Sequence, residues 1–263
     1  GVDIGGETSF ADIRAKHDAI LVATGVYKAR DIAAPGSGLD GIFPALEYLT
    51  VSNRKSLGDD VAAFDSGALN AEGKDVVVIG GGDTAMDCVR TAIRQKAKSV
   101  SCLYRRDRAN MPGSQREVQN AEEEGVVFKW LSAPQAFLGD DKVRAVQAQR
   151  IHLGQPDATG RQVPEVIDGS AHELPADMVI KALGFDPEDL PAMFGQDGLQ
   201  VTRWGTLKID WRTMMTNLDG VFAAGDIVRG ASLVVWGVRD GRDAAEAIDQ
   251  WIMAAADAPR AAG

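Results

Sequence analysis

The strongest structural signal in the chain is the stretch Asp75-Val76-Val77-Val78-Ile79-Gly80-Gly81-Gly82-Asp83-Thr84-Ala85. Its first five residues are rich in β-branched side chains, which predicts a buried strand over residues 75–79. Small and apolar side chains then recur at the spacing of one helix face, namely Ala85, Cys88, Val89, Ala92 and Ile93. A further strand over residues 99–104 completes a βαβ unit of about 30 residues. The sequence therefore predicts an α/β fold.

The glycine turn, residues 80–85, has the spacing Gly80-x-Gly82-x-x-Ala85, which fits the fingerprint of Rossmann-like dinucleotide-binding folds. In that fingerprint the first glycine permits a tight turn and the second lets the backbone approach a pyrophosphate. The small third residue lets the helix pack on the strand, and the helix N-terminus offers free N–H groups to the phosphates. We predict a dinucleotide site rather than a purely structural turn, formed by Gly80, Gly81, Gly82, Asp83, Thr84 and Ala85.

The residues that end the second strand indicate which dinucleotide binds. Sites for NAD place an Asp or Glu there, where it binds the ribose hydroxyls. This chain instead has Tyr104-Arg105-Arg106-Asp107-Arg108. Because an arginine fork matches phosphate oxygens, Arg105 and Arg106 favour the 2′-phosphate of NADP(H). The alternative is a solvated basic turn without a ligand.

Apolar runs and turn residues divide the rest of the chain. A buried strand is predicted over residues 19–23, ended by Thr24-Gly25, and residues 28–73 are expected to be connecting structure with one or two short helices. Small antiparallel strands are expected between residues 130 and 175. An apolar strand over residues 178–183 stops at Gly184, a short strand precedes Gly225-Asp226, and a final helix is expected over residues 232–256.

Composition excludes several classes of function. With 263 residues, the chain suggests about two domains at roughly 150 residues each. A net charge of −10 argues against nucleic-acid and membrane partners, and no run of about 18 apolar residues occurs. Two cysteines indicate a reducing, cytoplasmic setting. The chain begins with Gly1 rather than Met, so we expect that an upstream part is missing.

Some conspicuous residues have ordinary interpretations. Cys88 and Cys102 are expected to pack in the core. Asp226 could simply cap the helix that follows it, and Trp236 could pack near a bound group or in the core. The sequence contains no Ser–His–Asp constellation or carboxylate pair, so no side chain is predicted to act as an acid or a base.

Several segments together resemble one family, the small (β) subunit of bacterial NADPH-dependent glutamate synthase, and more widely the flavoproteins related to pyridine nucleotide-disulfide oxidoreductases. Its NADPH-site segment is similar to residues 77–88. Further similarity lies in Tyr104-Arg105-Arg106, in residues 110–114 and 120–125, and in the closing stretch over residues 224–236. The resemblance covers essentially the whole chain, but only the C-terminal half or so of the family.

The resemblance implies a nicotinamide-binding domain inserted into an FAD-binding domain. Residues 74–187 would form the NADPH-binding domain, while residues 1–73 and 188–263 would belong to the FAD-binding domain. NADPH would pass hydride to FAD, and electrons would leave through iron–sulfur clusters to a large subunit that makes glutamate. By the same resemblance, the residues near FAD or the nicotinamide are Thr24, Gly25, Ala182, Gly184, Gly225, Asp226, Ser232 and Leu233.

The chain departs from the family in its N-terminal part. No Gly-x-Gly-x-x-Gly follows a strand before Ala23, so the FAD site is incomplete, and two cysteines cannot ligate the clusters of the family. Two hypotheses follow. One is the NADPH-oxidising part of a glutamate-synthase-type flavoprotein, or of a related NADPH:ferredoxin-type oxidoreductase. The other is a truncated module that binds NADP(H) and catalyses nothing alone.

Overall fold

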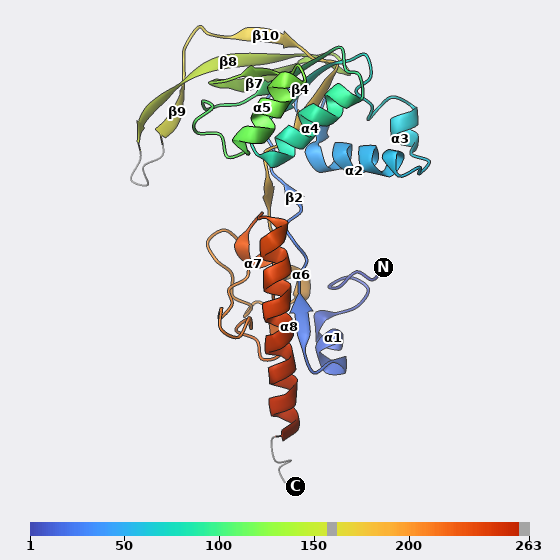
Figure 1. Cartoon of the computed structure of the whole chain (residues 1–263), viewed down its shortest axis with the longest axis vertical. Helices are drawn as coiled ribbons and strands as arrows, with labels where there is room; N and C mark the ends of the chain where they lie inside the picture. Colours follow the sequence, from blue (N-terminus) through green and yellow to red (C-terminus); the bar gives the residue numbers. More distant parts are fainter. Residues whose placement is uncertain (157–161, 258–263) are drawn as a thin grey trace. The chain divides into compact units, whose positions relative to one another are not determined.

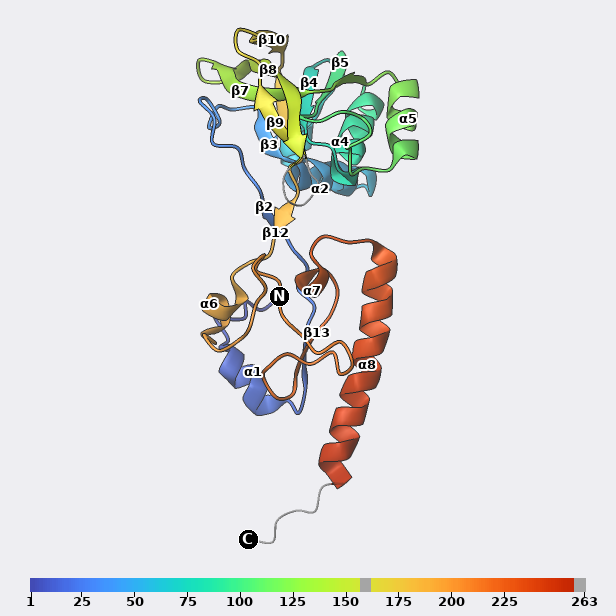
Figure 2. The ribbon, with the colours of Figure 1, turned by 90° about the vertical axis from the view of Figure 1, so that its left-hand side faces the viewer.

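The computed structural model describes residues 1–156 and 162–257 and divides the chain into two compact units. The first unit combines Gly1–Lys28 with Phe185–Gly263, and the second is Ala29–Gly184. The chain passes between them after Lys28 and again after Gly184. Two short strands lie at these points and pair with each other, β2 (Lys28–Ala29) and β12 (Phe185–Asp186); β2 is labelled in Figure 1 and both strands in Figure 2.

A five-stranded parallel sheet forms the centre of the second unit, in the order β3-β11-β4-β5-β6. Its strands are β3 (Ile42–Pro44), β11 (Met178–Lys181), β4 (Asp75–Ile79), β5 (Ser99–Leu103) and β6 (Val127–Lys129). Because parallel strands all end at the same edge of a sheet, the glycine turn after β4 emerges between the ends of β11 and β5.

The strand β4 is buried on both faces. Val76 and Val78 belong to a core that they share with the helices α2 (Ala45–Ser56), α4 (Asp83–Arg94) and α5 (Gln115–Glu123). Val77 and Ile79 point to the opposite face and pack against an antiparallel sheet. Figure 2 shows the helices on one side of β4 and the antiparallel strands on the other. This double burial explains the unbroken apolar run of β4.

The antiparallel sheet is built around one long strand. This strand, β8, pairs with each of the other three strands of the sheet. The four strands are β7 (Ser132–Gly139), β8 (Val143–Pro156), β9 (Gln162–Val166) and β10 (His172–Pro175). Antiparallel strands between residues 130 and 175 are thus confirmed, but β8, with 14 residues, is longer than the small strands that were predicted.

In the first unit, a two-stranded parallel sheet pairs β1 (Ile20–Val22) with β13 (Val221–Ala223). The described helices of this unit are α1 (Phe10–Lys16), α6 (Leu190–Phe194), α7 (Asp226–Arg229) and α8 (Val234–Asp257). The rings of Phe10 and Phe194 stack with centroids 4.5 Å apart, and Trp251 of α8 meets Phe222 edge-on at 6.3 Å. No helix in the two described ranges has both the length and the apolar character needed to cross a bilayer.

The second unit begins earlier than residue 74, the predicted start of the nucleotide-binding region. The physical reason is that β3 extends the parallel sheet beside β11, and α2 packs on it with the side chain of Tyr48 fully buried. The predicted short helices between residues 28 and 73 are α2 and α3 (Ala62–Asp65). A three-residue strand that ends in proline carries too short a pattern to be recognised in sequence.

Candidate functional site

Gly80 is confined by backbone from both neighbouring strands. Its φ is +150°, and a Cβ built there would lie 2.1 Å from the carbonyl oxygen of Ala182, just after β11. The Gly80 amide donates to the carbonyl oxygen of Leu103, the last residue of β5, at 3.1 Å. No residue with a side chain fits here without moving the backbone, so the turn must begin with glycine.

Gly81 and Gly82 differ in what surrounds them. A Cβ on Gly81 would come within 2.4 Å of Tyr104 Cε2, so Gly81 lies against the Tyr104 ring. A Cβ on Gly82 would meet no atom of a described residue within 4 Å. The space in front of the Gly82 backbone is therefore open, as the close approach of a pyrophosphate requires.

The first turn of α4 presents unpaired amide groups beside this open space. Within residues 1–156 and 162–257, no hydrogen bond engages the N–H groups of Gly82, Asp83 or Thr84. The first helical bond is from the Ala85 amide to the Gly82 carbonyl oxygen, at 2.9 Å. Ala85 is fully buried, so its small side chain lets the helix pack closely on the sheet. Together these amides and the helix dipole have the arrangement of a candidate anion-binding site.

Asp83 is the one acidic residue of the glycine turn, and its side chain is hydrogen-bonded to the backbone of a neighbouring loop. Its Oδ1 accepts the Ser114 amide at 2.9 Å. The next residue back, Gly113, donates its amide to the Gly81 carbonyl oxygen at 3.0 Å. These bonds fix the loop over residues 104–114 to the glycine turn, and they set the direction of the Asp83 carboxylate.

The two predicted arginines follow β5 but have different environments. Arg105 is exposed, and its guanidinium has no hydrogen bond or ion pair with any described residue. Arg106 is partly buried and leans toward β9, where Nη2 lies 3.5 Å from the Gln162 carbonyl oxygen and Nε is buried without a partner among described residues. A 3.5 Å contact is a weak hydrogen bond. Arg105 is thus the side chain most available to a phosphate.

The segment over residues 182–184 continues β11 next to the glycine turn. The Ala182 amide donates to the Ile79 carbonyl oxygen at 2.8 Å, and Gly184 has φ +86°. Just before the segment, Lys181 Nζ lies 2.6 Å from Asp31 Oδ1, and this hydrogen bond lowers the pKa of Asp31. Ala182 and Gly184 therefore lie on a fixed backbone at the edge where the predicted cofactor would bind.

In the first unit, the two predicted FAD-binding segments leave the sheet side by side. The Ala224 amide donates to the Val22 carbonyl oxygen at 3.1 Å, which places the segment with Thr24 and Gly25 beside Gly225. Gly25 has φ +73°, and Gly225 has φ +77° and ψ −150°. Both turns therefore rely on backbone conformations that favour glycine.

Asp226 begins α7 but does not cap it through its side chain, since the N-cap is Gly225. Burial raises the pKa of the Asp226 carboxyl, an effect opposed by a hydrogen bond from the Ser232 amide. Leu233 follows, and its carbonyl oxygen accepts the first bonds of α8. Trp236, on the first turn of α8, is 39% exposed and so does not belong to the core.

Sequence reasoning missed Arg229 and Asp240, which flank the Gly225–Asp226 turn. The Asp240 carboxylate is buried and accepts hydrogen bonds from both the Gly225 amide and the Arg229 side chain. A signal existed, because Asp240 lies four residues before Ala244 in the helix expected over residues 232–256 and so shares a face with this apolar residue. A carboxylate on such a face needs a partner.

The cysteines have structural positions. The Cys102 thiol donates a hydrogen bond to the Gly80 carbonyl oxygen at 3.4 Å, and Cys88 of α4 packs in the core. Cys88 and Cys102 are free thiols with no exposed surface, as predicted. Burial raises the pKa of the Cys102 thiol to about 12 and that of Cys88 further still. Neither is therefore in the thiolate form that reacts or binds metal near neutral pH.

The chain belongs to the pyridine nucleotide-disulphide oxidoreductase family, which it matches over residues 6–258. It is 68% identical over 257 residues to the glutamate synthase [NADPH] small chain of Azospirillum brasilense, and 65% identical over 246 residues to a putative glutamate synthase [NADPH] small chain of Cereibacter sphaeroides. These alignments cover 98% and 94% of this chain but 53% and 59% of the relatives. The chain thus spans little more than half the length of these relatives.

Solved structures support the same fold. Mycobacterium tuberculosis FprA in complex with NADPH superimposes with a TM-score of 0.76 at 18% sequence identity, over 97% of this chain and 68% of FprA. The predicted fold class, a Rossmann-like α/β unit, is confirmed by the parallel sheet, by the family match and by this likeness.

The open space at Gly82 leads to a test of the site. Replacing Gly82 by Ala should change the free energy of unfolding by no more than about 1 kcal/mol, because the new methyl group meets nothing. The methyl group would occupy the space of the pyrophosphate, so the dissociation constant for NADPH, measured by fluorescence titration, should rise at least about tenfold. Gly38→Ala, which also adds a methyl group in open space, is the matched control. Unchanged NADPH binding by the Gly82→Ala variant would refute this location.

Proposed function

We propose that this chain is the NADPH-binding part of a flavoprotein oxidoreductase of the glutamate synthase small-chain type. The observation that carries the proposal is that the amides of Gly82, Asp83 and Thr84 have no partner among the described residues and lie beside the open space at Gly82, at the carboxyl edge of a parallel sheet. The names of the relatives, which include NADPH, support this choice of cofactor.

The preference for NADP(H) over NAD(H) rests on charge at the end of β5. Arg105 is exposed and unpaired there among described residues. The acid that is closest in sequence, Asp107, is occupied, because its Oδ1 accepts both the backbone amide and the side-chain amide of Asn110 at 2.9 and 2.8 Å. The position that binds ribose hydroxyls in NAD sites thus carries a cation, which suits a 2′-phosphate.

FAD is proposed for the first unit, and the residues there suit the flavin half of that cofactor. A Cβ on Gly225 would meet no described atom within 4 Å, so a ligand can approach its backbone. Asp226 would hold ribitol hydroxyls, Ser232 and Leu233 would lie near the flavin and the nicotinamide, and Thr24 and Gly25 would belong to the strand-end segment of the FAD site. When bound, FAD supplies the hydride-accepting chemistry, and these residues bind and orient it.

The fate of the electrons is proposed from the relatives alone. In a glutamate synthase they would pass through iron–sulfur clusters to a large subunit and support glutamate formation. The buried thiols of Cys88 and Cys102 do not suit cluster ligation, so the clusters and the ADP-binding half of the FAD site would come from a segment or chain other than this one.

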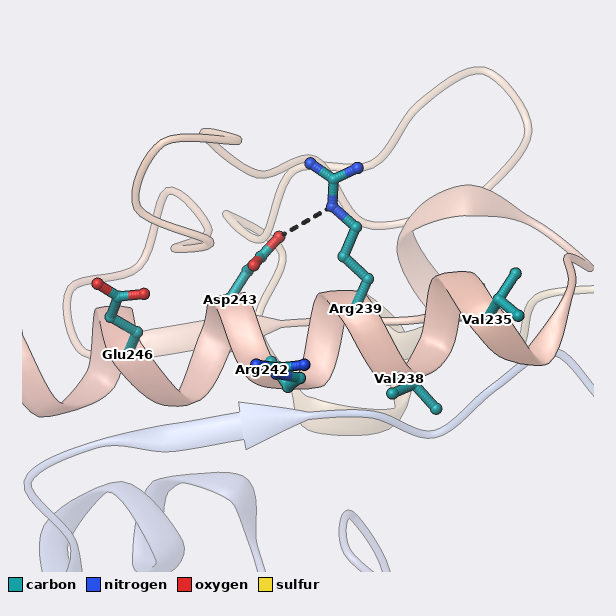
Figure 3. A pocket seen from close by; sticks show the side chains of 6 residues that line it. All are labelled: Val235, Val238, Arg239, Arg242, Asp243 and Glu246. Carbon is teal, nitrogen blue, oxygen red and sulfur yellow. Dashed lines mark ion pairs between the residues drawn. The ribbon is translucent and has the colours of Figure 1, made fainter.

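A second candidate function is an NADP(H)-binding module that catalyses nothing alone. It is favoured by the exposed apolar surface of the first unit, where Leu21, Leu233, Val234 and Val235 all keep more than a third of their surface open. A shallow pocket on α8, lined by Val235, Val238, Arg239, Arg242, Asp243 and Glu246, lies in the same region (Figure 3). Such a surface suits a unit whose flavin site is completed by another segment.

The phosphate assignment predicts a selective loss in one variant. Arg105→Ala should raise the dissociation constant for NADPH at least about tenfold, and leave that for NADH within about twofold, since only NADPH carries the 2′-phosphate. Arg106→Ala should have a smaller effect on NADPH, because its side chain leans toward Gln162.

The matched control for this experiment is Arg108→Ala. Arg108 lies on the same loop, but its guanidinium is paired with both carboxylate oxygens of Glu122. Its loss should leave the ratio of NADPH to NADH affinity unchanged. Equal losses of NADPH and NADH binding in Arg105→Ala would contradict the 2′-phosphate assignment.

A visible spectrum separates the two candidate functions. If the chain alone forms a working hydride-transfer site, added FAD should remain bound through gel filtration, and its absorption band should bleach on anaerobic addition of NADPH. Saturable NADPH binding without retained flavin would instead identify the nucleotide-binding module. Failure to bind NADPH at all would contradict both functions.

A further inference from the structure

A buried carboxylate connects three elements of the first unit. Asp240, on α8, is 1% exposed and accepts hydrogen bonds from Arg229 Nε at 2.6 Å and Nη2 at 2.7 Å. The same carboxylate accepts the Gly225 amide at 3.3 Å. Asp240 thereby fixes both the end of β13 and the end of α7 to α8.

Two indole rings further restrict Arg229. Its Cζ lies 4.7 Å from the centroid of the Trp211 ring and 4.8 Å from that of Trp236. Cation–π contacts at these distances add to the charge-assisted bonds with Asp240. A planar guanidinium held by its edge and by two aromatic rings has little freedom to turn.

The ion pair acts at a point of the turn where the backbone is free to adopt many conformations. Gly225, with φ +77° and ψ −150°, lies in a region that is open to glycine almost alone. Because glycine can also take other conformations, the bond from the Gly225 amide to Asp240 selects this one. Asp226 follows directly, so the direction of its carboxylate depends on this bond.

The charged groups around the turn lie on α7 and α8, and two of the three carboxylates are paired with arginines. Asp240 is negative and close enough to Asp226 to raise the pKa of that carboxyl, in addition to the larger effect of burial. Arg229 compensates Asp240, and the hydrogen bond between them lowers the pKa of Asp240. Arg239 and Asp243 lie beyond them on α8 and pair with each other at 3.6 Å.

We propose that Arg229 and Asp240 are a positioning pair that holds the Gly225–Asp226 turn in the conformation that binds the ribitol chain of a flavin. The proposal rests on the proposed function for the identity of the ligand. The hold on the turn itself is a property of this chain that can be measured without flavin.

The test compares Asp240→Asn with Asp243→Asn in the 263-residue chain. Figure 3 shows Asp243 pointing toward Arg239 along α8, so its substitution removes a carboxylate from the same helix without touching the turn. Amide hydrogen exchange of residues 224–232 should become at least about tenfold faster in Asp240→Asn and stay unchanged in Asp243→Asn. Peptides from α1 and α6 should exchange as in the wild type.

The test is completed by the conservative variant Arg229→Lys and by the affinities for FAD and NADPH. Arg229→Lys keeps a charge for Asp240 and should loosen the turn less than Arg229→Met does. Affinity for added FAD should fall in parallel with the loss of protection, by about tenfold or more in Asp240→Asn, while NADPH affinity stays within about twofold.

Each outcome bears on a different claim. Unchanged exchange of residues 224–232 in Asp240→Asn would overturn the positioning pair, as would equally faster exchange across the whole first unit, which indicates a general structural role. FAD affinity that stays at the wild-type value while the turn loosens would also overturn it. A wild-type chain that binds no FAD, with a turn that still depends on Asp240, would overturn the flavin assignment and leave the hold on the turn supported.

Discussion

The close approach of Gly80 to the Ala182 carbonyl oxygen is the constraint on which the nucleotide-binding region depends. It brings the end of β4 directly against the end of β11, so the chain must turn without a side chain at that point. The turn then directs α4 away from the sheet edge with its first amides unpaired. Any larger residue at Gly80 would push the two strand ends apart and move the amides of Gly82 and Asp83 from the edge.

The charge near the glycine turn differs in sign from the overall charge of the chain. A net charge of −10 opposes the approach of an anionic dinucleotide, yet two acids near the glycine turn are engaged by backbone amides. Asp83 accepts the Ser114 amide, and Asp107 accepts that of Asn110. The exposed Arg105 and the N-terminus of α4 supply positive potential for phosphate at this edge even though the whole molecule is acidic.

Hydrophobic patterns that extend over five or more residues predicted much of the fold. The strand at residues 75–79 and the helix after it were predictable because burial on both sheet faces and on one helix face leaves clear periodicity. The strand β3 and the early start of the second unit were not, since three residues carry no period. The different environments of Arg105 and Arg106 depend on where β9 returns along the sheet. The pairing of Asp240 with Gly225 depends likewise on tertiary contacts between segments 15 residues apart.

The central claim is that the open amides at the start of α4 bind the pyrophosphate of NADP(H). The most direct test is a titration of the ¹⁵N-labelled chain with NADP⁺, followed in its amide NMR spectrum. The account predicts saturable shifts concentrated at Gly82, Asp83 and Thr84, with further shifts at Arg105 and around Ala182. Saturable shifts that leave these amides unmoved, or no shifts at millimolar NADP⁺, would contradict it.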